Sequence, residues 1–197
     1  MAITKPTQVV TGEVRISYEH LLQPHSMSGK DEDAKYSATL LIPKTDTATK
    51  ARLDAAIQAA IQEGLAGKWG GAKLLQPPVP LYDGDGVRPN GEPFGPECAG
   101  HWVMTASSKQ QQEIVDLSLN PILNPTEVYS GMYARVSINF FAYNSNGKKG
   151  VGAGLGPVQK TRDGEPLGGR VTAADAFGYF VVPADAPKIN PITGLPM

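Results

Sequence analysis

The sequence contains a single cysteine, Cys98, so the chain cannot form an intramolecular disulfide bond. This fits the reducing interior of a cell better than an oxidising compartment. The sequence also lacks any run near the roughly 18 consecutive apolar residues that a membrane-spanning helix needs. Its N-terminal segment, MAITKPTQVV, lacks the basic and then apolar pattern of a secretory signal. We therefore expect a cytoplasmic protein that does not contact a membrane.

Strong net charge is absent as well, because 18 Lys and Arg residues are balanced by 19 Asp and Glu residues in a chain of 197. A protein that held nucleic acid by bulk charge alone would be strongly basic, so that class is excluded. The 22 glycines and 17 prolines exceed average usage, which favours a β-rich domain with many turns. A hydrophobic content of 41% argues against extensive disorder.

Motifs for catalysis, cofactors and metals are missing too. The glycines between positions 147 and 156 match neither the dinucleotide fingerprint nor the P-loop. The DGDG segment at 83–86 lacks the later glutamate of a calcium loop, and one cysteine with scattered histidines does not make a structural zinc site. Cys98 has no local signature of a cysteine enzyme, and no G-x-S-x-G motif is present. We expect a non-enzymatic protein without cofactor or metal.

What is present is mainly β pattern. Alternating apolar residues predict strands, at residues 7–18, 35–42, 101–108, a short segment near 113–117, 131–143 and 150–161. Segments 19–34, 76–100 and the turn 144–149 are polar or rich in proline and glycine, and are expected to be loops.

One segment has helical spacing instead. Leu53, Ile57, Ile61 and Leu65 recur every four residues and form a single apolar stripe, which predicts a helix over about 46–66. Its start can be capped by Thr45 or Asp46, and glycines at 64 and 67 mark its end.

Five or so strands around one main helix favour an OB-fold-like five-stranded barrel with long loop insertions. We expect one domain over residues 1–182. The final segment, 183–197, contains four prolines and is expected to be an extended arm.

The strand predicted at 131–143 has two distinct faces. One is apolar throughout, which predicts a buried face. The other combines aromatic rings, a cation and small polar groups, and its larger members are Tyr133, Arg135, Phe141 and Tyr143. Such a face can stack nucleic-acid bases, or it can simply pack beneath a loop or helix. The alternating glycines at 150, 152, 154 and 156 also have two interpretations. They can permit sharp strand curvature or close packing, or they can allow a ligand to approach the backbone closely.

Basic charge is concentrated near the same hairpin. Residues 135–170 hold six basic and two acidic residues, and therefore carry +4 in a chain whose total is −1. Lys148 and Lys149 are expected at the tip between the last two strands, one of the loops that OB folds use for oligonucleotides, and 19–34 is the other. A local basic groove could follow a phosphate backbone, although charged turns occur on any protein surface.

Other aromatic residues are weaker candidates. Trp69, Tyr82 and Trp102 are more typical of core or loop packing than of DNA contact. Tyr18 and Tyr36 continue apolar strand registers, so we expect both in the core.

Residues 129–170, YSGMYARVSINFFAYNSNGKKGVGAGLGPVQKTRDGEPLGGR, followed by AADAF, resemble a family of tailed-bacteriophage single-stranded DNA-binding proteins with OB-type folds. Upstream segments such as VRISYEHLLQP and KYSATLLIPK also resemble it, so the similarity covers roughly residues 10–180. The family's better-known relatives end in an acidic tail, whereas 181–197 holds one acidic residue, Asp185, balanced by Lys188.

The resemblance implies a protein that coats single-stranded DNA with little sequence preference during phage DNA replication and recombination, in the cytoplasm of the infected host. Duplex DNA, phage replication proteins and self-association along DNA are further partners that it implies. The alternative is a structural or assembly component of a phage that uses the same β barrel without binding DNA. For the DNA-binding function, the predicted base-stacking residues are Tyr133, Phe141 and Tyr143, and the predicted phosphate contacts are Arg135, Lys148, Lys149, Lys160 and Arg162.

Overall fold

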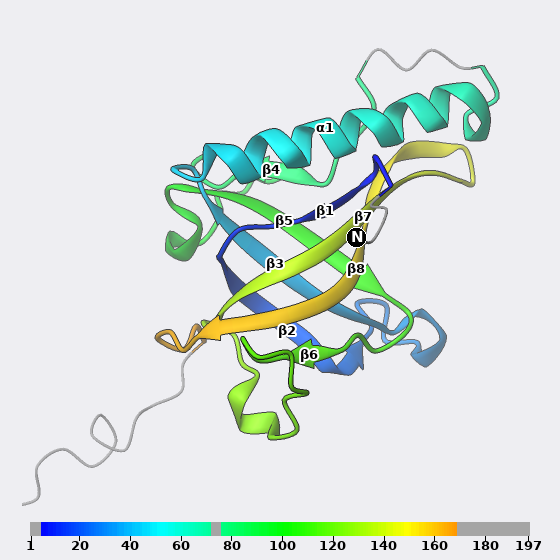
Figure 1. Cartoon of the computed structure of the whole chain (residues 1–197). Coiled ribbons are helices and arrows are strands. Elements are labelled where there is room, and N and C mark those ends of the chain that lie inside the picture. The colour runs from blue at the N-terminus through cyan, green and yellow to red at the C-terminus, as the bar shows by residue number, and fades with distance from the viewer. Residues whose placement is uncertain (1–4, 72–75, 169–197) are drawn as a thin grey trace, which may run out of the picture.

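The computed structural model describes residues 5–71 and 76–168 (Figure 1). Its strands are β1 (Gln8–Val10), β2 (Val14–His25), β3 (Lys35–Pro43), β4 (Leu81–Asp83), β5 (His101–Ser108), β6 (Ile114–Val115), β7 (Tyr133–Ser145) and β8 (Lys148–Arg162). The main helix is α1 (Thr47–Glu63), followed by a π-helical turn over Gly64–Lys68. Three short 3-10 turns occupy Asp31–Asp33, Pro96–Cys98 and Pro125–Glu127.

Five strands close into a ring in the order β7, β2, β3, β5 and β8, because β8 pairs back onto β7. All contacts within this ring are antiparallel except the one between β5 and β8. Short strands extend it at its margins: β1 pairs with β7, β4 with β5 and β6 with β8. Helix α1 lies across one end of the ring (Figure 1). The expected mainly-β architecture, with a five-strand ring and one main helix, is confirmed.

The core fills the inside of this ring and the space beneath α1. The face of β7 predicted to be buried is buried along its whole length, including Val136 and Ile138 with no exposed surface. From α1 the apolar stripe contributes Leu53, Ile57 and Ile61. Burial of such side chains stabilises the fold by about 25 cal/mol per Å² of apolar surface removed from water.

Asp46 begins α1, as one of the two predicted caps, because its Oδ1 accepts a hydrogen bond of 3.0 Å from the Thr49 backbone N–H. The helix continues beyond Glu63 into the π-helical turn, which brings Trp69 into the core. Trp69 is 1% exposed and its indole N–H donates to the Tyr143 carbonyl at 2.9 Å, so its packing role is confirmed.

The predicted strand 7–18 is wrong as a single element. It is divided between β1 and β2 because the Thr11 side chain accepts the hydrogen bond of the Val136 N–H, and Gly12 turns to donate to the Thr49 hydroxyl. The predicted loop 19–34 is also too long, since β2 continues to His25.

The turn 144–149 is shorter than predicted. Strands β7 and β8 extend until only Asn146 and Gly147 separate them, and both residues have positive φ, as a tight two-residue hairpin turn requires. The loop 76–100 holds β4 and a 3-10 turn but is otherwise irregular, as expected. The predicted arm at 183–197 lies outside the described residues. Within the described part of the chain, no helix combines the length and apolar character needed to cross a membrane.

Candidate nucleic-acid interface

The eight residues predicted from the sequence lie along the outer side of the β7–β8 hairpin, where the aromatic rings cover the glycines. A β-carbon built on Gly150 would lie 2.6 Å from the Tyr143 hydroxyl oxygen, and one built on Gly152 would lie 2.6 Å from Phe141 Cζ. The alternating glycines therefore make room for these rings, which supports the packing interpretation. Phe141 keeps 41% of its surface exposed.

Near the other end of the hairpin, Tyr133 and the basic residues already have partners within the protein. The Arg162 guanidinium lies 3.5 Å from the Tyr133 ring centroid and donates to Glu13 Oε1 at 2.9 Å. Hydrogen bonds from Thr161 and then Arg162 lower the pKa of the Glu13 carboxyl. Lys160 is mostly buried and pairs with Asp163 at 2.7 Å.

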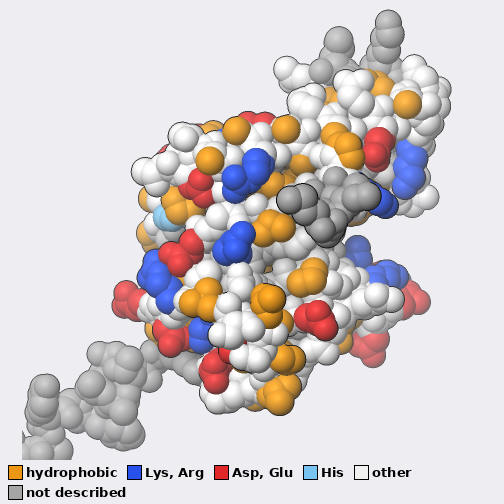
Figure 2. Space-filling model, in the orientation of Figure 1, with side chains coloured by type: hydrophobic (Ala, Val, Ile, Leu, Met, Phe, Trp, Pro, Cys, Tyr) orange, Lys and Arg blue, Asp and Glu red, His pale blue; other side chains and the backbone are white. Residues whose placement is uncertain are grey.

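Arg135 is exposed, and its guanidinium makes long hydrogen bonds to the Thr11 carbonyl and the Gln159 amide, at 3.5 and 3.4 Å. In Figure 2, which views the side of β1, β7 and β8, basic and acidic side chains are interspersed among the described residues. The hairpin tip differs, because Lys148 is exposed there, while Lys149 Nζ donates to the Trp69 carbonyl at 2.9 Å. Phe141, Arg135, Lys148 and Arg162 are the exposed members of the eight predicted residues, and of these Arg162 is paired with Glu13.

A groove runs over the outer face of β2, β3 and β5. It consists of two adjoining cavities of about 390 and 590 Å³, which share Tyr18, Thr39 and Thr105. The floor between them is polar and uncharged, with the Thr39 and Thr105 hydroxyls hydrogen-bonded at 2.9 Å. We call this surface the β2–β3–β5 groove.

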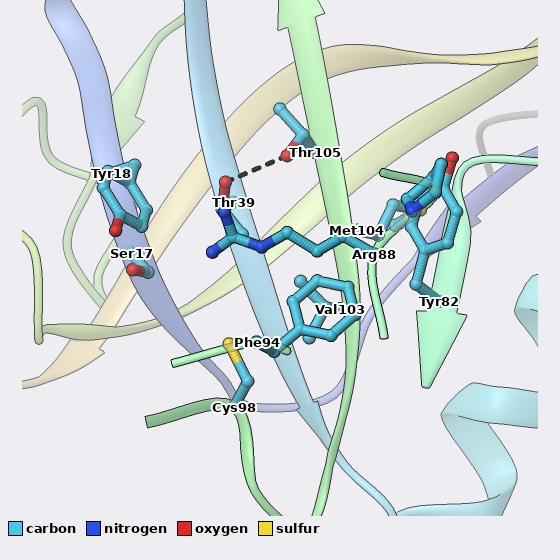
Figure 3. A pocket seen from close by; sticks show the side chains of 11 residues that line it. Ser17, Tyr18, Thr39, Tyr82, Arg88, Phe94, Cys98, Val103, Met104 and Thr105 are labelled. Carbon is cyan, nitrogen blue, oxygen red and sulfur yellow. Dashed lines mark hydrogen bonds between the residues drawn. The ribbon is translucent and has the colours of Figure 1, made fainter. Parts of the chain in front are cut away.

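One half of the β2–β3–β5 groove has aromatic walls (Figure 3). Tyr18 stands on one side, and Phe94, Tyr82 and Arg88 stand on the other. The Arg88 guanidinium lies 5.4 Å from the Phe94 ring centroid, and the Phe94 and Tyr82 centroids are 6.4 Å apart. Aromatic faces beside a cation suit the stacking of bases and the binding of phosphates.

The other half is formed by the β2–β3 hairpin and carries stacked imidazoles. The His20 and His25 rings are 4.5 Å apart and nearly parallel. Burial, and then the charge of His25, lower the pKa of His20, so that histidine is held in its neutral form over a wider pH range. Lys35 and Met27 line the same cavity, and Met27 is almost fully exposed.

Tyr18 was predicted to be buried, and this prediction is wrong, since 64% of its surface is exposed. Its φ of +45° is uncommon for a residue other than glycine, and the pairing of β2 with β3 shifts register between Ser17 and His20. The bulge turns Tyr18 outward although Ile16 points inward. The sequence carries one signal of this bulge. Ile16 and Leu21 are both apolar and lie five positions apart, so both can be buried, as they are, only if the strand is irregular at one residue between them.

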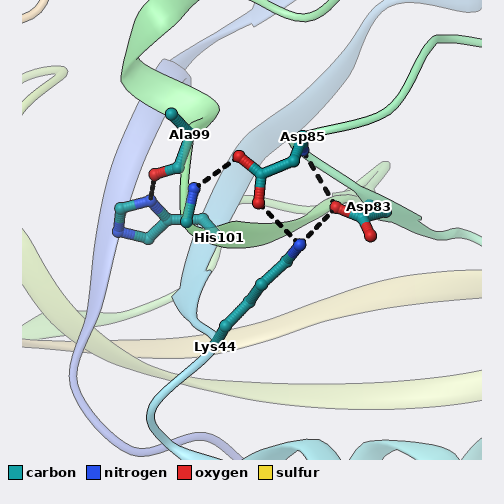
Figure 4. A network of polar contacts seen from close by, with 6 residues as sticks. Lys44, Asp83, Asp85, Ala99 and His101 are labelled. Atoms are coloured by element: carbon teal, nitrogen blue, oxygen red, sulfur yellow. Dashed lines mark hydrogen bonds and ion pairs between the residues drawn. The ribbon is translucent and has the colours of Figure 1, made fainter.

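The irregular segment 84–100, which we call the flap, positions Arg88 and Phe94. Lys44, the residue directly after β3, contacts Asp83 Oδ1 at 2.5 Å and Asp85 Oδ2 at 2.7 Å through its Nζ (Figure 4). Asp85 also accepts a hydrogen bond from the Gly100 N–H at 2.9 Å, so this network joins both ends of the flap. The hydrogen bonds from Lys44 lower the pKa values of both aspartates. No local sequence pattern reveals this arrangement, because its members come from distant segments.

The β2–β3–β5 groove and the β7–β8 hairpin are neighbours on the surface. Ser107 of β5, which lines the groove, is the bridge partner of Gly154 in β8. The Phe141 ring lies 3.8 Å from the position of a β-carbon on Gly154. Phe141 is therefore adjacent to the edge of the groove. Within residues 5–71 and 76–168, no three His, Cys, Asp or Glu side chains come together as a metal-binding group.

A family model described as the ssDNA-binding protein of Enterobacter phage Enc34 matches residues 7–187. The chain belongs to this family. A relative named putative protein p50, from Acyrthosiphon pisum secondary endosymbiont phage 1, is 31% identical over 181 residues, which cover 86% of this chain and 92% of the relative. The family resemblance predicted from the sequence is thus confirmed.

Solved structures of phage single-stranded DNA-binding proteins are similar in fold to this chain. The single-stranded DNA-binding protein from bacteriophage Enc34 in complex with ssDNA is similar at 30% identity and a TM-score of 0.68, over 83% of this chain and 91% of that one. A second structure, of the single-stranded DNA-binding protein from bacteriophage Enc34, is similar at 31% identity and a TM-score of 0.66, over 88% of this chain and 91% of that one. The single-stranded DNA-binding protein gp2.5 of bacteriophage T7, at 15% identity and a TM-score of 0.53 over 84% and 97%, shares the fold.

Proposed function

We propose that this protein binds single-stranded DNA along the β2–β3–β5 groove, with bases stacked on Tyr18 and Phe94. The observation that carries the proposal is the conformation of Tyr18, whose large ring is exposed beside the groove in a backbone conformation that is strained for tyrosine. Strain of this kind persists only where the surrounding structure imposes it, and it is concentrated at functional sites. Membership in a family of ssDNA-binding proteins supports the same function.

The groove is suited to binding with little sequence preference. Its floor is lined by small hydroxyl side chains, including Ser37, Thr39, Thr105 and Ser107. Aromatic stacking contributes about 1–3 kcal/mol per base and accepts every base, because each has a π-face. Arg88 and Lys35 lie in different halves of the groove and can contact phosphates.

The residues predicted from the sequence form the second part of the proposal. A strand leaving the groove over Ser107 would meet Phe141 and then the hairpin tip with Lys148 and Lys149. The other predicted residues are Tyr133, Arg135, Tyr143, Lys160 and Arg162. Most of these would have to exchange their present partners for DNA. Arg135, Lys160 and Arg162 would then contact phosphates, of single-stranded or duplex DNA, and Tyr133 and Tyr143 would stack bases.

In this proposal the protein coats DNA during phage replication and recombination in the host cytoplasm, without catalysis. Neighbouring copies on one strand and phage replication proteins are its proposed protein partners. A phage structural or assembly component that uses the same five-strand ring without DNA is the alternative function.

Fluorescence anisotropy of labelled oligo-dT, measured at several salt concentrations, tests the proposal. Tyr18→Ala and Phe94→Ala should each weaken binding roughly 5- to 150-fold, which corresponds to the loss of about 1–3 kcal/mol of stacking. Leu123→Ala, an exposed side chain away from the groove, is the matched control and should bind as the wild type does. If Phe141→Ala and Lys148→Ala weaken binding while the groove variants do not, DNA follows the hairpin instead. Absence of wild-type binding at low salt would favour the structural alternative.

A further inference from the structure

The loop that follows β6 exposes three leucines within seven residues. Leu117, Leu119 and Leu123 have 66, 71 and 87% of their surface exposed. We call residues 116–124 the leucine loop. Hydrophobic side chains are visible over β6 and the chain after it in Figure 2. None of the three leucines lines the β2–β3–β5 groove, so DNA binding does not explain their exposure.

The backbone of the leucine loop is held in one conformation. Asp116 Oδ1 accepts hydrogen bonds from the Ser118 and Asn120 N–H groups at 2.8 and 2.9 Å. The Asp116 N–H donates to the Asn120 carbonyl, and the Ile122 N–H donates to the Ile114 carbonyl in β6. A surface fixed in this way loses little conformational entropy when it binds a partner.

Leu119 has a φ of +65°, in the left-handed region that glycine or asparagine occupies at much lower cost. The chain therefore bears strain and exposes an apolar side chain at the same position. Folding alone favours neither feature. Departures from local rules without a structural gain are characteristic of functional sites.

The charge around the leucine loop indicates the kind of partner. Residues 110–134 contain Glu113, Asp116 and Glu127 but no lysine or arginine. The nearest basic side chains in the adjoining hollow, Lys160 and Arg162, are already paired with acidic residues. Apolar side chains within an acidic surrounding are complementary to an apolar segment flanked by basic residues.

We propose that the leucine loop is a protein-docking surface, and that its occupant is a basic amphipathic segment of another protein. Leucines 117, 119 and 123 supply the apolar contacts, and Asp116 and Glu127 attract lysines or arginines beside them. DNA remains bound in the β2–β3–β5 groove, because the two surfaces share no residue. The proposal does not depend on the ssDNA-binding function.

The test uses a synthetic amphipathic helix of leucine and lysine, its leucine–glutamate counterpart, and backbone-amide NMR spectra of the full chain. The basic peptide should shift the amide signals of residues 116–128, and the acidic peptide should bind at least fivefold more weakly. The double variant Leu117→Ser/Leu123→Ser should bind the basic peptide at least fivefold more weakly, while its oligo-dT affinity stays unchanged. Val10→Ser, an exposed apolar residue on β1, is the matched control and should bind the peptide normally.

Leu119→Asn separates docking from folding. It should raise the melting temperature by a few degrees, because the strain at position 119 is relieved, and it should lower the affinity for the basic peptide. The proposal would be overturned by equal binding of both peptides, by amide shifts centred on the groove, or by full peptide binding by the double variant. Sedimentation that shows wild-type self-association abolished by Leu117→Ser/Leu123→Ser would assign the surface to a second copy of the chain and would likewise overturn it.

Discussion

The Phe141 side chain covers Gly152 so closely that a β-carbon on this glycine would lie 2.6 Å from Phe141 Cζ. This contact spans two neighbouring strands, since the two residues are paired across β7 and β8. The glycine thus supplies the space in which the aromatic ring lies, and the ring shields backbone that a side chain would otherwise cover. Phe141 owes its position beside the groove to this pairing.

The pairing predicts energetic coupling between the two positions. Gly152→Ala should displace the Phe141 ring, whereas in a Phe141→Ala background the same change has no ring to displace. Urea denaturation of the four proteins in this double-mutant cycle should give a coupling free energy of about 1 kcal/mol. Gly67→Ala, where an added β-carbon meets nothing within 4 Å, is the control and should add independently to Phe141→Ala. Additivity at Gly152 would contradict the contact.

Two variants of Tyr18 should bind DNA alike but differ in stability. Tyr18→Ala and Tyr18→Gly both remove the ring and should lower oligo-dT affinity alike. Alanine retains the strain of the left-handed conformation, so the glycine variant should be more stable than the alanine variant by about 1 kcal/mol. Thermal or urea denaturation measures the difference. Equal stability of the two variants would mean that the backbone at Tyr18 is not strained.

The lysines at the hairpin tip should affect the salt dependence of binding, and only Lys149 should also affect stability. Lys148→Ala should reduce the slope of log affinity against log salt by about 0.7, the value for one phosphate contact on a single strand. Lys149→Ala should also lower stability, because it removes the hydrogen bond to the Trp69 carbonyl. Lys50→Ala, on α1 and paired with Asp54, should leave the slope unchanged. An unchanged slope for Lys148→Ala would place this lysine away from DNA.

Lys44 should control the flap rather than the overall fold. Lys44→Met removes both contacts to Asp83 and Asp85, so the flap should open more often and chymotrypsin should cleave after Phe94 at least several-fold faster. Oligo-dT affinity should fall in parallel, and Lys44→Arg should restore both properties. Lys50→Met is the matched control. Wild-type cleavage rates in Lys44→Met would show that the flap is held by its other contacts.

The pH dependence of stability should reveal the interaction of Glu13 with Thr161 and Arg162. The hydrogen bonds lower the pKa of Glu13 in the folded protein below its ordinary value of 4.5. The carboxylate therefore stabilises the fold fully above about pH 4.5, and this contribution is lost as the pH falls through the lowered pKa. The urea midpoint of the wild type should exceed that of Glu13→Gln at pH 7, and the gap should narrow progressively as the pH falls below 4.5. A gap that is constant over this range would exclude a titration effect.

Sequence patterns were sufficient where one local period decides the structure. Strict alternation in residues 131–143 predicted the buried face of β7, and the four-residue spacing from Leu53 predicted α1. The sequence of residues 129–170, which includes the β7–β8 hairpin, also revealed the family. The predicted DNA contacts lie on this hairpin because its composition was the most distinctive.

By itself, then, the sequence determined the mainly-β class, the main helix, the family and the expectation that DNA is the ligand. Only the tertiary structure decided that the five strands close into a ring, that a bulge turns Tyr18 outward, and that the flap brings Phe94 and Arg88 opposite it. The physical reason is distance along the chain. A local period reports which face of one element is buried, whereas the groove depends on pairings between β2, β3 and β5 and on the Lys44 contacts that hold the flap over them.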